Sequence, residues 1–358
     1  MVVERDPSYA RASSQLSASG IRQQFTTPAN IALSRFGVEF LRRAHEELAV
    51  EGDAPPDLAF REQGYLTLAA SGGVAALDAA FSVQRQAGAA LAWLDPAALA
   101  ARFPWLSTGG IAAGVLGLSG EGWFDGPALH AALRRKARAL GAEWVHGEAA
   151  SFEREGARIA AVRLADGRRV AAGRVINAAG PYARGVAALA GIELPVEARK
   201  RSVFVLRCRE PVTPCPLVVD TSGAWFRPEG EGFIAGFSPA DDAEDLGLDV
   251  DHEAFEEVLW PRLAARVRAF EALRVVGAWA GHYEYCTWDQ NALLGTLPEA
   301  PNLIFANGFS GHGMQHAPGA GRAVAEWALY GDWRSLDVSA LHVRRLIEGR
   351  KVVEGHVI

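Results

Sequence analysis

Cysteine and lysine are both scarce in this sequence. The three cysteines, Cys208, Cys215 and Cys286, form no Cys-x-x-Cys pair and cannot all be joined by disulfides, which excludes a disulfide-stabilised secreted scaffold. Only three of the 36 basic residues are lysine, and 42 acidic residues bring the formal net charge to -6. This charge argues against a surface built to neutralise the phosphates of a nucleic acid. We therefore expect no nucleic-acid partner.

Long hydrophobic runs are also absent. The longest nearly uncharged stretch, 109–120, is rich in glycine and shorter than the roughly 18 to 20 apolar residues that a membrane helix needs. The first residues, MVVERDPSYAR, lack the apolar region of a signal peptide. The sequence therefore predicts no integral membrane segment, and we expect a cytoplasmic protein in a reducing compartment.

What the sequence does contain is enough apolar surface for a large core. With 358 residues, 49% of them hydrophobic, about two domains are expected. Apolar periodicity predicts helices over 35–50, 74–87, 95–103, 127–140, 182–190, 251–270 and 318–330. Strands are expected over 2–4, 60–70, 143–152, 158–164, 169–172, 174–177, 203–206, 217–220, 224–227, 232–237, 275–285 and 303–306. Alternating β and α at both chain ends, with an antiparallel block between them, indicates an α/β domain of discontinuous segments beside a second domain.

The start of the chain carries the first candidate site. An acidic residue at the end of the second strand of a dinucleotide-binding unit accepts hydrogen bonds from ribose hydroxyls, and Glu4 follows the apolar pair Val2-Val3. The loop 12–22 that follows is rich in serine and glycine. Taken alone, Glu4 is equally compatible with a solvated surface charge, and the loop with an ordinary turn.

Two later segments combine a buried strand with a glycine-containing helix start. The first is RVINAAGPYA over 174–183, and the second is NLIFANGFSGHGMQ over 302–315. Small residues let the backbone approach a ligand, and a helix N-terminus presents N–H groups to anionic or carbonyl oxygens. Close packing of helix on strand would explain the first segment without a ligand, and a tight turn is the alternative for the second.

Together these segments resemble the D-amino-acid oxidase superfamily of FAD-dependent enzymes, which includes glycine oxidase, sarcosine oxidase and dimethylglycine dehydrogenase. The resemblance is closest to the FAD-dependent oxidoreductase domain-containing subfamily, whose mitochondrial members are assembly factors of respiratory complex I. It covers essentially the whole chain and rests on VVERDPSYARASSQLSASGIRQQF, VINAAGPYA, GHYEYCTWDQN and GFSGHGMQHAPGAGRAVAEW. It implies a Rossmann-like FAD-binding domain over 1–35, 121–195 and 286–358, and an antiparallel-sheet substrate domain over 36–120 and 196–285.

The resemblance also implies FAD as cofactor and assigns residues to its parts. Glu4 would hold the adenosine ribose, and Ala149 would meet the adenine through its backbone. The other implied contacts are Ser13 and Ser14 near the diphosphate and ribityl chain, Gly20, Ile21 and Arg22 against the isoalloxazine, Ala178, Ala179, Gly180 and Tyr182 on the diphosphate side, and Gly308, Ser310, Gly311, Gly313 and Met314 around the pyrimidine edge.

One departure from the family concerns the Gly-x-Gly-x-x-Gly strand-loop-helix that in relatives precedes the position of Val2. Gly319-Ala320-Gly321 is no substitute, because it follows no strand. The expectation is either an incorrect translation start or a short protein with weakened FAD affinity. Loss of that strand would expose unpaired backbone groups on its neighbours.

Three further departures bear on the reaction. Gln315 stands where sarcosine oxidases have a lysine that holds the substrate carboxylate, while Arg22 remains at the other carboxylate position. His282 stands where they have a flavin-linked cysteine, and the segment 237–243 has no oxygen-activating lysine. We expect oxidation of a primary or secondary amine of a small amino-acid-like substrate by hydride transfer to flavin N5, by a dehydrogenase rather than an oxidase. A respiratory or other electron-transfer protein would be a partner. The alternative is a flavin-binding assembly factor without turnover.

Several other patterns are set aside. His312 and His316 lack the glutamate of a zinc protease helix, so no metal site is predicted. Ser310 lacks the second glycine of a hydrolase nucleophile elbow. Asp289 would either lie near the flavin or cap a turn, and Trp279, Tyr283 and Tyr285 would form either a pocket wall or plain core.

Overall fold

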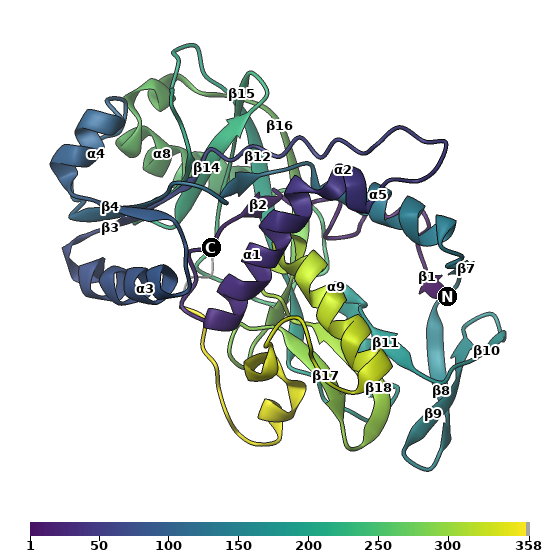
Figure 1. The fold of residues 1–358 in the computed structure, drawn as a ribbon. Coiled ribbons are helices and arrows are strands. Elements are labelled where there is room, and N and C mark those ends of the chain that lie inside the picture. Colours follow the sequence, from purple (N-terminus) through teal and green to yellow (C-terminus); the bar gives the residue numbers. More distant parts are fainter. Residues whose placement is uncertain (356–358) are drawn as a thin grey trace.

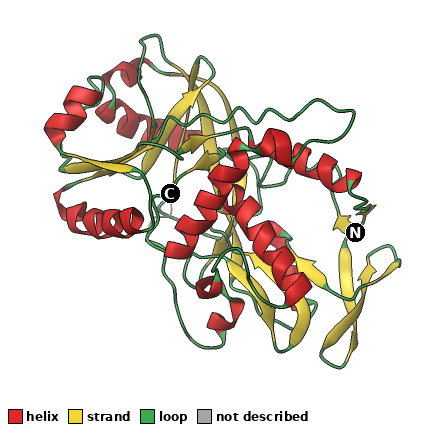
Figure 2. Ribbon diagram, viewed as in Figure 1, coloured by secondary structure: helices red, strands yellow, loops and turns green. Residues whose placement is uncertain are grey.

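Two parts built on different sheets make up the molecule, and two long helices cross between them (Figure 1). The computed structural model describes residues 1–355. Its fold is mixed α/β, as predicted (Figure 2). The helices are α1 (Pro28–Arg42), α2 (Ala44–Glu47), α3 (Val74–Gln86), α4 (Pro96–Arg102), α5 (Gly126–Ala139), α6 (Ala183–Ala188), α7 (His252–Ala254), α8 (Trp260–Arg266) and α9 (Gly313–Tyr330).

The larger part is organised around an eight-stranded sheet. Its strands, in spatial order, are β16 (Arg274–Cys286), β12 (Val196–Arg207), β15 (Gly232–Phe237), β14 (Ala224–Glu229), β13 (Leu217–Val219), β3 (Tyr65–Ala69), β5 (Ala113–Gly117) and β4 (Leu91–Leu94). Neighbouring strands are antiparallel except at β13 and β3, which are parallel and join segments far apart in the chain. The antiparallel block predicted from the sequence is therefore confirmed.

Side-chain alternation gives this sheet two different faces. Phe226, Val218 and Leu66 point to one face, where they pack with the apolar side chains of 255–270, including those of α8. The residues that precede them on the same strands, such as Trp225 and Tyr65, belong to a separate cluster on the opposite face. The first face forms a closed hydrophobic core, and the second is turned toward the other part of the molecule.

The smaller part carries short sheets. Its strands are β1 (Val2–Glu4) parallel to β7 (Trp144–His146); β11 (Val175–Asn177) parallel to β18 (Ala300–Asn307), which is antiparallel to β17 (Leu293–Leu297); and the antiparallel set β8 (Ala149–Glu155), β9 (Arg158–Leu164) and β10 (Arg169–Ala171). Within residues 1–355 no strand joins β1 to β11. On β11, Ile176 is 48% exposed, so the face of the sheet to which its side chain points is uncovered there.

Helices α1 and α9 pack against each other between the two parts (Figure 1). Helix α1 starts at Pro28, not at the predicted residue 35, because Thr27 is extended and Pro28 fits the first helical turn. A side chain at Gly37 would meet the backbone oxygen of Gln315 at the start of α9. This close approach fixes the position of the α9 N-terminus. Helix α1 runs across residue 35, where one predicted domain boundary lies. The predicted boundaries themselves stay predictions.

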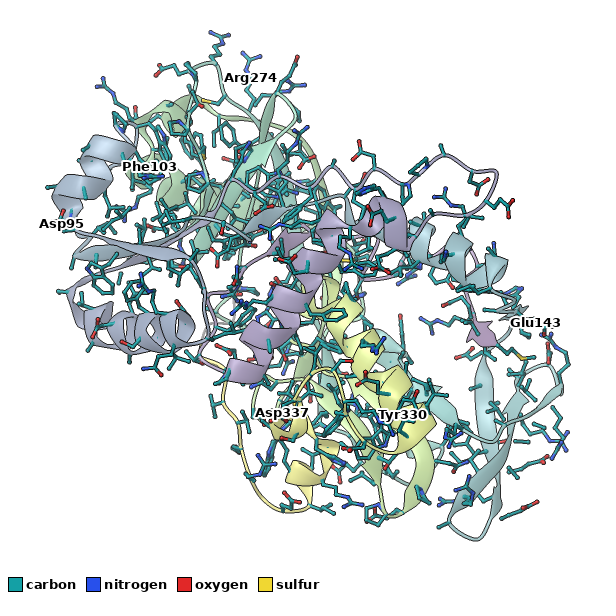
Figure 3. All side chains as sticks on the ribbon, viewed as in Figure 1. Asp95, Phe103, Glu143, Arg274, Tyr330 and Asp337 are labelled. Atoms are coloured by element: carbon teal, nitrogen blue, oxygen red, sulfur yellow. The ribbon has the colours of Figure 1, made fainter. Side chains whose placement is uncertain are left out.

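Other expected elements differ in their bounds. The helix predicted over 251–270 is broken into α7, a π-helical turn Phe255–Leu259, α8 and a 3-10 turn Arg268–Ala272. Pro261 near the start of α8 lacks an N–H to continue the preceding turns. Strand 203–206 is part of the longer β12, and α9 begins at Gly313 with Pro318 inside it. In contrast, α4 lies where predicted, between Asp95 and Phe103, which Figure 3 labels.

Candidate flavin and substrate site

The end of β1 meets the turn that begins after β11. Glu4 pairs with His146 on β7, and its carboxylate accepts a hydrogen bond from the backbone N–H of Asp6 at 2.9 Å. The guanidinium of Arg5 lies over the Tyr182 ring, 3.5 Å from its centroid. The structure thus brings together two segments that the sequence assigned separately to the nucleotide half of FAD.

The turn after β11 is built for close approach of a ligand. Asn177 organises it, since its side-chain oxygen accepts from the Ala179 N–H at 3.2 Å and its amide donates to the Ala183 carbonyl at 3.0 Å. Gly180 has φ +55°, and a Cβ placed there would meet no atom within 4 Å. The space in front of Gly180 is therefore open. Ala178 is exposed beside it.

The loop after β1 carries a buried hydroxyl. Ser13 Oγ is buried and has no hydrogen-bond partner in the described part of the chain, so it can donate to or accept from a bound group. Ser14 lies half-buried in the same loop, and Ala149 is half-buried at the first position of β8. The role of Ala149 stays a prediction.

At the flavin end, Arg22 and Gln315 meet across 293 positions of sequence. Strand β2 (Gly20–Ile21) pairs with β6 (Gly122–Trp123). The Arg22 N–H that follows β2 donates to Gln315 Oε1 at 2.9 Å. The Arg22 guanidinium is buried, donates to the Gln24 carbonyl at 2.6 Å and lies 3.2 Å from His312 Nε2. Two residues predicted as catalytic are thus direct neighbours.

A buried carboxyl group that sequence reasoning missed holds this segment. Glu121 Oε1 accepts from the Gln23 N–H at 2.6 Å, and Oε2 accepts from the Gln24 side-chain amide at 2.8 Å. Burial raises the pKa of Glu121 to about 7, while these hydrogen bonds and the nearby Arg22 oppose the shift. The only signal in the sequence was a single acid within an otherwise uncharged, glycine-rich stretch.

The turn before α9 has the geometry of a ligand cradle. Ser310 accepts from the Cys286 N–H at 3.0 Å, which ties the turn to the end of β16. Gly311 has φ +90°, and any side chain there would collide with the Tyr283 ring. Just before the turn, both amide atoms of Asn307 are buried without a partner among the described residues. The Asn307 amide and the N-terminus of α9 thus lie on either side of this turn, beside Gly313 and Met314, where the pyrimidine edge of the flavin is predicted.

Glu284 on β16 also faces this turn. Its Oε1 would lie 3.7 Å from a Cβ on Gly313, and its Oε2 is buried with no partner within 1–355. Burial raises the pKa of Glu284 to about 8, while the backbone N–H groups of Gly308 and Phe309 oppose the shift. This residue was not singled out from the sequence.

The site-facing side of the eight-stranded sheet lies opposite Gly20. A side chain on Gly20 would collide with the Tyr65 hydroxyl. Burial raises the pKa of Tyr65, and the charges of Arg22 and Arg227 oppose the shift, so both arginines lie near this phenol. The surrounding apolar cluster combines aromatic and aliphatic side chains, among them Trp123, Trp225, Leu217, Ile234 and Trp279. Trp279 is thus part of the wall that faces β2, the strand predicted to lie against the isoalloxazine and called the flavin strand below.

His282 lies apart from Arg22 and Gln315. It is buried on β16 opposite Lys200, and its Nε2 lies 2.9 Å from the Gly247 carbonyl. Burial lowers the pKa of His282. The side chain is therefore held by the loop around Gly247, and its catalytic role stays a prediction.

No group of three or more His, Cys, Asp or Glu side chains in residues 1–355 is placed to hold a metal ion. Likewise, none of the described helices is long and apolar enough to cross a membrane.

These features suit a dinucleotide with a flavin at one end. Open space at Gly180 and the unpartnered Ser13 hydroxyl suit an anionic linker, and the polar turn before α9 suits a heteroaromatic edge rich in acceptors. Between them, Gly20 and Ile21 present backbone toward the aromatic sheet face.

Comparison with known proteins agrees with this geometry. The sequence profile described as DAO, FAD dependent oxidoreductase, matches residues 1–327. FAD-dependent oxidoreductase domain-containing protein 1 of Xenopus laevis is 42% identical over 392 residues, covering 100% of this chain and 79% of that protein. 4-methylaminobutanoate oxidase (formaldehyde-forming) of Paenarthrobacter nicotinovorans is 27% identical over 87% of this chain and 38% of its own length. Among solved structures, L-proline dehydrogenase from P. horikoshii superposes with TM-score 0.84 at 26% identity, covering 95% of this chain and 89% of that one.

Proposed function

Because the chain belongs to the DAO family of FAD-dependent oxidoreductases and its cofactor is FAD, we propose that it is an amine dehydrogenase. Its substrate is a small amino-acid-like molecule with a primary or secondary amine. The C–H bond beside the nitrogen would lose a hydride and the nitrogen would lose a proton, and water would hydrolyse the resulting imine to a carbonyl compound and an amine or ammonia. The observation that carries this proposal is the meeting of Arg22 and Gln315 opposite the aromatic sheet face around Tyr65.

The residues that would hold the cofactor lie at its two ends. Glu4, Ser13 and the turn at Gly180 suit the nucleotide half, and Gly20 with the turn before α9 suits the flavin half. When bound, FAD supplies the electron acceptor, so the protein's contribution is positioning, exclusion of water and local charge.

The chain's own residues perform three tasks in this reaction. The apolar cluster around Trp225 would exclude water from the reacting groups on this face of the sheet. Arg22 places positive charge beside the flavin strand for an acidic substrate, and Glu121 fixes the backbone that follows Arg22. Gln315 is uncharged and bonds the Arg22 backbone. The absence of a lysine from the segment 237–243, and His282 at the position of a flavin-linked cysteine, favour a dehydrogenase over an oxidase.

The first test is anaerobic reduction of the FAD-loaded protein. We would mix it with sarcosine, 4-methylaminobutanoate, L-proline and glycine and follow the absorbance band of the flavin at about 450 nm. At least one amine should bleach this band, and air should restore the colour slowly compared with an artificial electron acceptor. Replacement of Arg22 by alanine should raise the KM for that amine at least about tenfold, because a charge-assisted contact is lost. An unchanged KM at full FAD occupancy would rule out Arg22 as a substrate contact.

A second candidate function is a flavin-binding assembly factor for a respiratory complex. It is favoured by apolar side chains exposed on β11 and at the outer end of α9, namely Ile176, Leu329 and Tyr330, the last of which Figure 3 labels. This alternative predicts a bound flavin that none of the four amines reduces and a stable complex with a respiratory subunit. Bleaching by any of them at a catalytic rate would contradict it.

A further inference from the structure

Arg227 is a buried guanidinium on the substrate side of the sheet. It lies on β14, two residues from Trp225 and therefore on the same face, whereas Phe226 points into the opposite core. Its Nη2 donates to the Ala18 carbonyl at 2.8 Å, and its guanidinium lies 5.2 Å from the centroid of the Trp123 ring. Arg227 thus reaches across the interface to the segment that leads into the flavin strand.

The acid paired with Arg227 is more exposed than the acids paired with Arg345 and Arg266. Arg345 and Asp289 form a pair in which both side chains are fully buried, and Arg266 pairs with the buried Asp220 at 2.6 Å. The acid that Arg227 pairs with, Glu229, has a side chain that is 50% exposed. Arg227 Nε is also buried with no hydrogen-bond partner among residues 1–355. A desolvated guanidinium with an unused donor is incompletely compensated by this part of the chain.

The surroundings of Arg227 indicate which chemical group of a ligand would neutralise its positive charge. The Tyr65 hydroxyl lies against Gly20 within reach of the charges of both Arg22 and Arg227. Arg22 is engaged on the flavin-domain side by Gln24 and His312. Arg227 faces the same phenol from the sheet. A carboxylate is the anion that matches a planar guanidinium, and aromatic walls exclude the water that would compete for it.

We propose that Arg227 binds the carboxylate of the substrate from the sheet side of the site. This inference rests on the proposed function, because it assigns a residue to the acidic end of an amino-acid-like amine. It predicts that ligands are selected for a carboxylate even when they carry no amine. Tyr65 lies beside that carboxylate and is the second donor available to it.

The test measures binding without turnover. Propionate and its neutral isostere propionamide are titrated into the FAD-supplemented protein by isothermal titration calorimetry. The variants are Arg227→Met, which keeps the length of the side chain, and Arg227→Lys, which keeps the charge but not the planar fork. The matched control is Arg207→Met, which removes another arginine of the same sheet whose glutamate partner, Glu231, is exposed. Melting temperature identifies any variant that does not fold.

The protein and Arg207→Met should both prefer propionate to propionamide at least about tenfold, the size expected for a charge-assisted hydrogen bond. Arg227→Met should show a much smaller preference than Arg207→Met, the remainder coming from Arg22, and Arg227→Lys should lie between the two variants. A preference in Arg227→Met as large as that in Arg207→Met, or no preference in the unaltered protein, would overturn the proposal. If Arg227→Met does not fold, Arg227→Lys decides, since an unreduced preference in it contradicts a planar, two-point contact. Amine turnover is not measured, so failure of the proposed reaction is a separate result.

Discussion

Buried charge is handled differently in two regions of this molecule. Around the loop after β16, Arg345 donates to both oxygens of Asp289 and to four backbone carbonyls. Between the sheet and the flavin strand, Arg227 has an exposed acid as partner, and Glu284 has a buried oxygen without one within residues 1–355. The first region saturates its charges from its own chain, which stabilises the fold. The second keeps buried polar atoms, Arg227 Nε and Glu284 Oε2, that have no hydrogen-bond partner within residues 1–355, which is typical of a ligand site.

Replacement of Asp289 by alanine should break the saturated region most severely. It leaves the fully buried guanidinium of Arg345 without its acid and removes an acceptor for the Val352 N–H. We expect the free energy of unfolding to fall by about 3 to 5 kcal/mol, as for other broken buried pairs. Urea denaturation followed by circular dichroism measures this loss. The exposed Glu299→Ala is the control and should change stability by less than about 0.5 kcal/mol. A loss equally small for Asp289→Ala would remove the distinction between the regions.

Replacement of Glu121 by glutamine should sharpen the comparison through pH. Folding raises the pKa of Glu121 from its ordinary value of 4.5 to about 7. The folded protein therefore binds this proton more tightly than the unfolded chain, so the contribution of Glu121 to stability falls as pH rises from about 4.5 to about 7. The fall amounts to about 3 kcal/mol at about 1.4 kcal/mol per pKa unit.

The measurement is the difference in unfolding free energy between the protein and Glu121→Gln at several pH values. Relative to the unaltered protein, the variant should gain stability as pH rises across this window, because glutamine does not titrate. Parallel stability curves for the two proteins would show that Glu121 keeps an ordinary pKa.

Glu354→Ala should have the smallest of the three effects. The Glu354 carboxylate accepts from the Thr26 and Thr27 N–H groups at 2.8 and 3.0 Å and from the Asn30 amide at 3.0 Å, at the start of α1. Its loss removes an anionic cap of that helix, and we expect about 2 kcal/mol lower stability by thermal or urea unfolding. Glu348→Ala, at an exposed position, is the control. A fully stable Glu354→Ala would show that this contact does not hold α1.

Much of the fold and part of the site could be predicted from sequence because their signals are local. The turn at 308–313 and helix α5 with its Asp125 cap have short motifs with a physical reason. Glu121 and Arg227 were missed for the opposite reason. Glu121 holds Gln23 across 98 positions, and Arg227 reaches Ala18 across 209. Local sequence patterns do not predict hydrogen bonds between residues so far apart in the chain. A lone arginine in a strand cannot be distinguished from a surface charge until its burial is known.

The parallel pairing of β3 with β13 also sets how the site is assembled in time. Tyr65 on β3 pairs with Leu217, so the two halves of the eight-stranded sheet join only after the chain between them has been made and placed. Tyr65 and Arg227 come from opposite sides of that joint. Tyr65 lies against Gly20 and Arg227 bonds the Ala18 carbonyl, so local separation of β3 from β13 would disturb both contacts together.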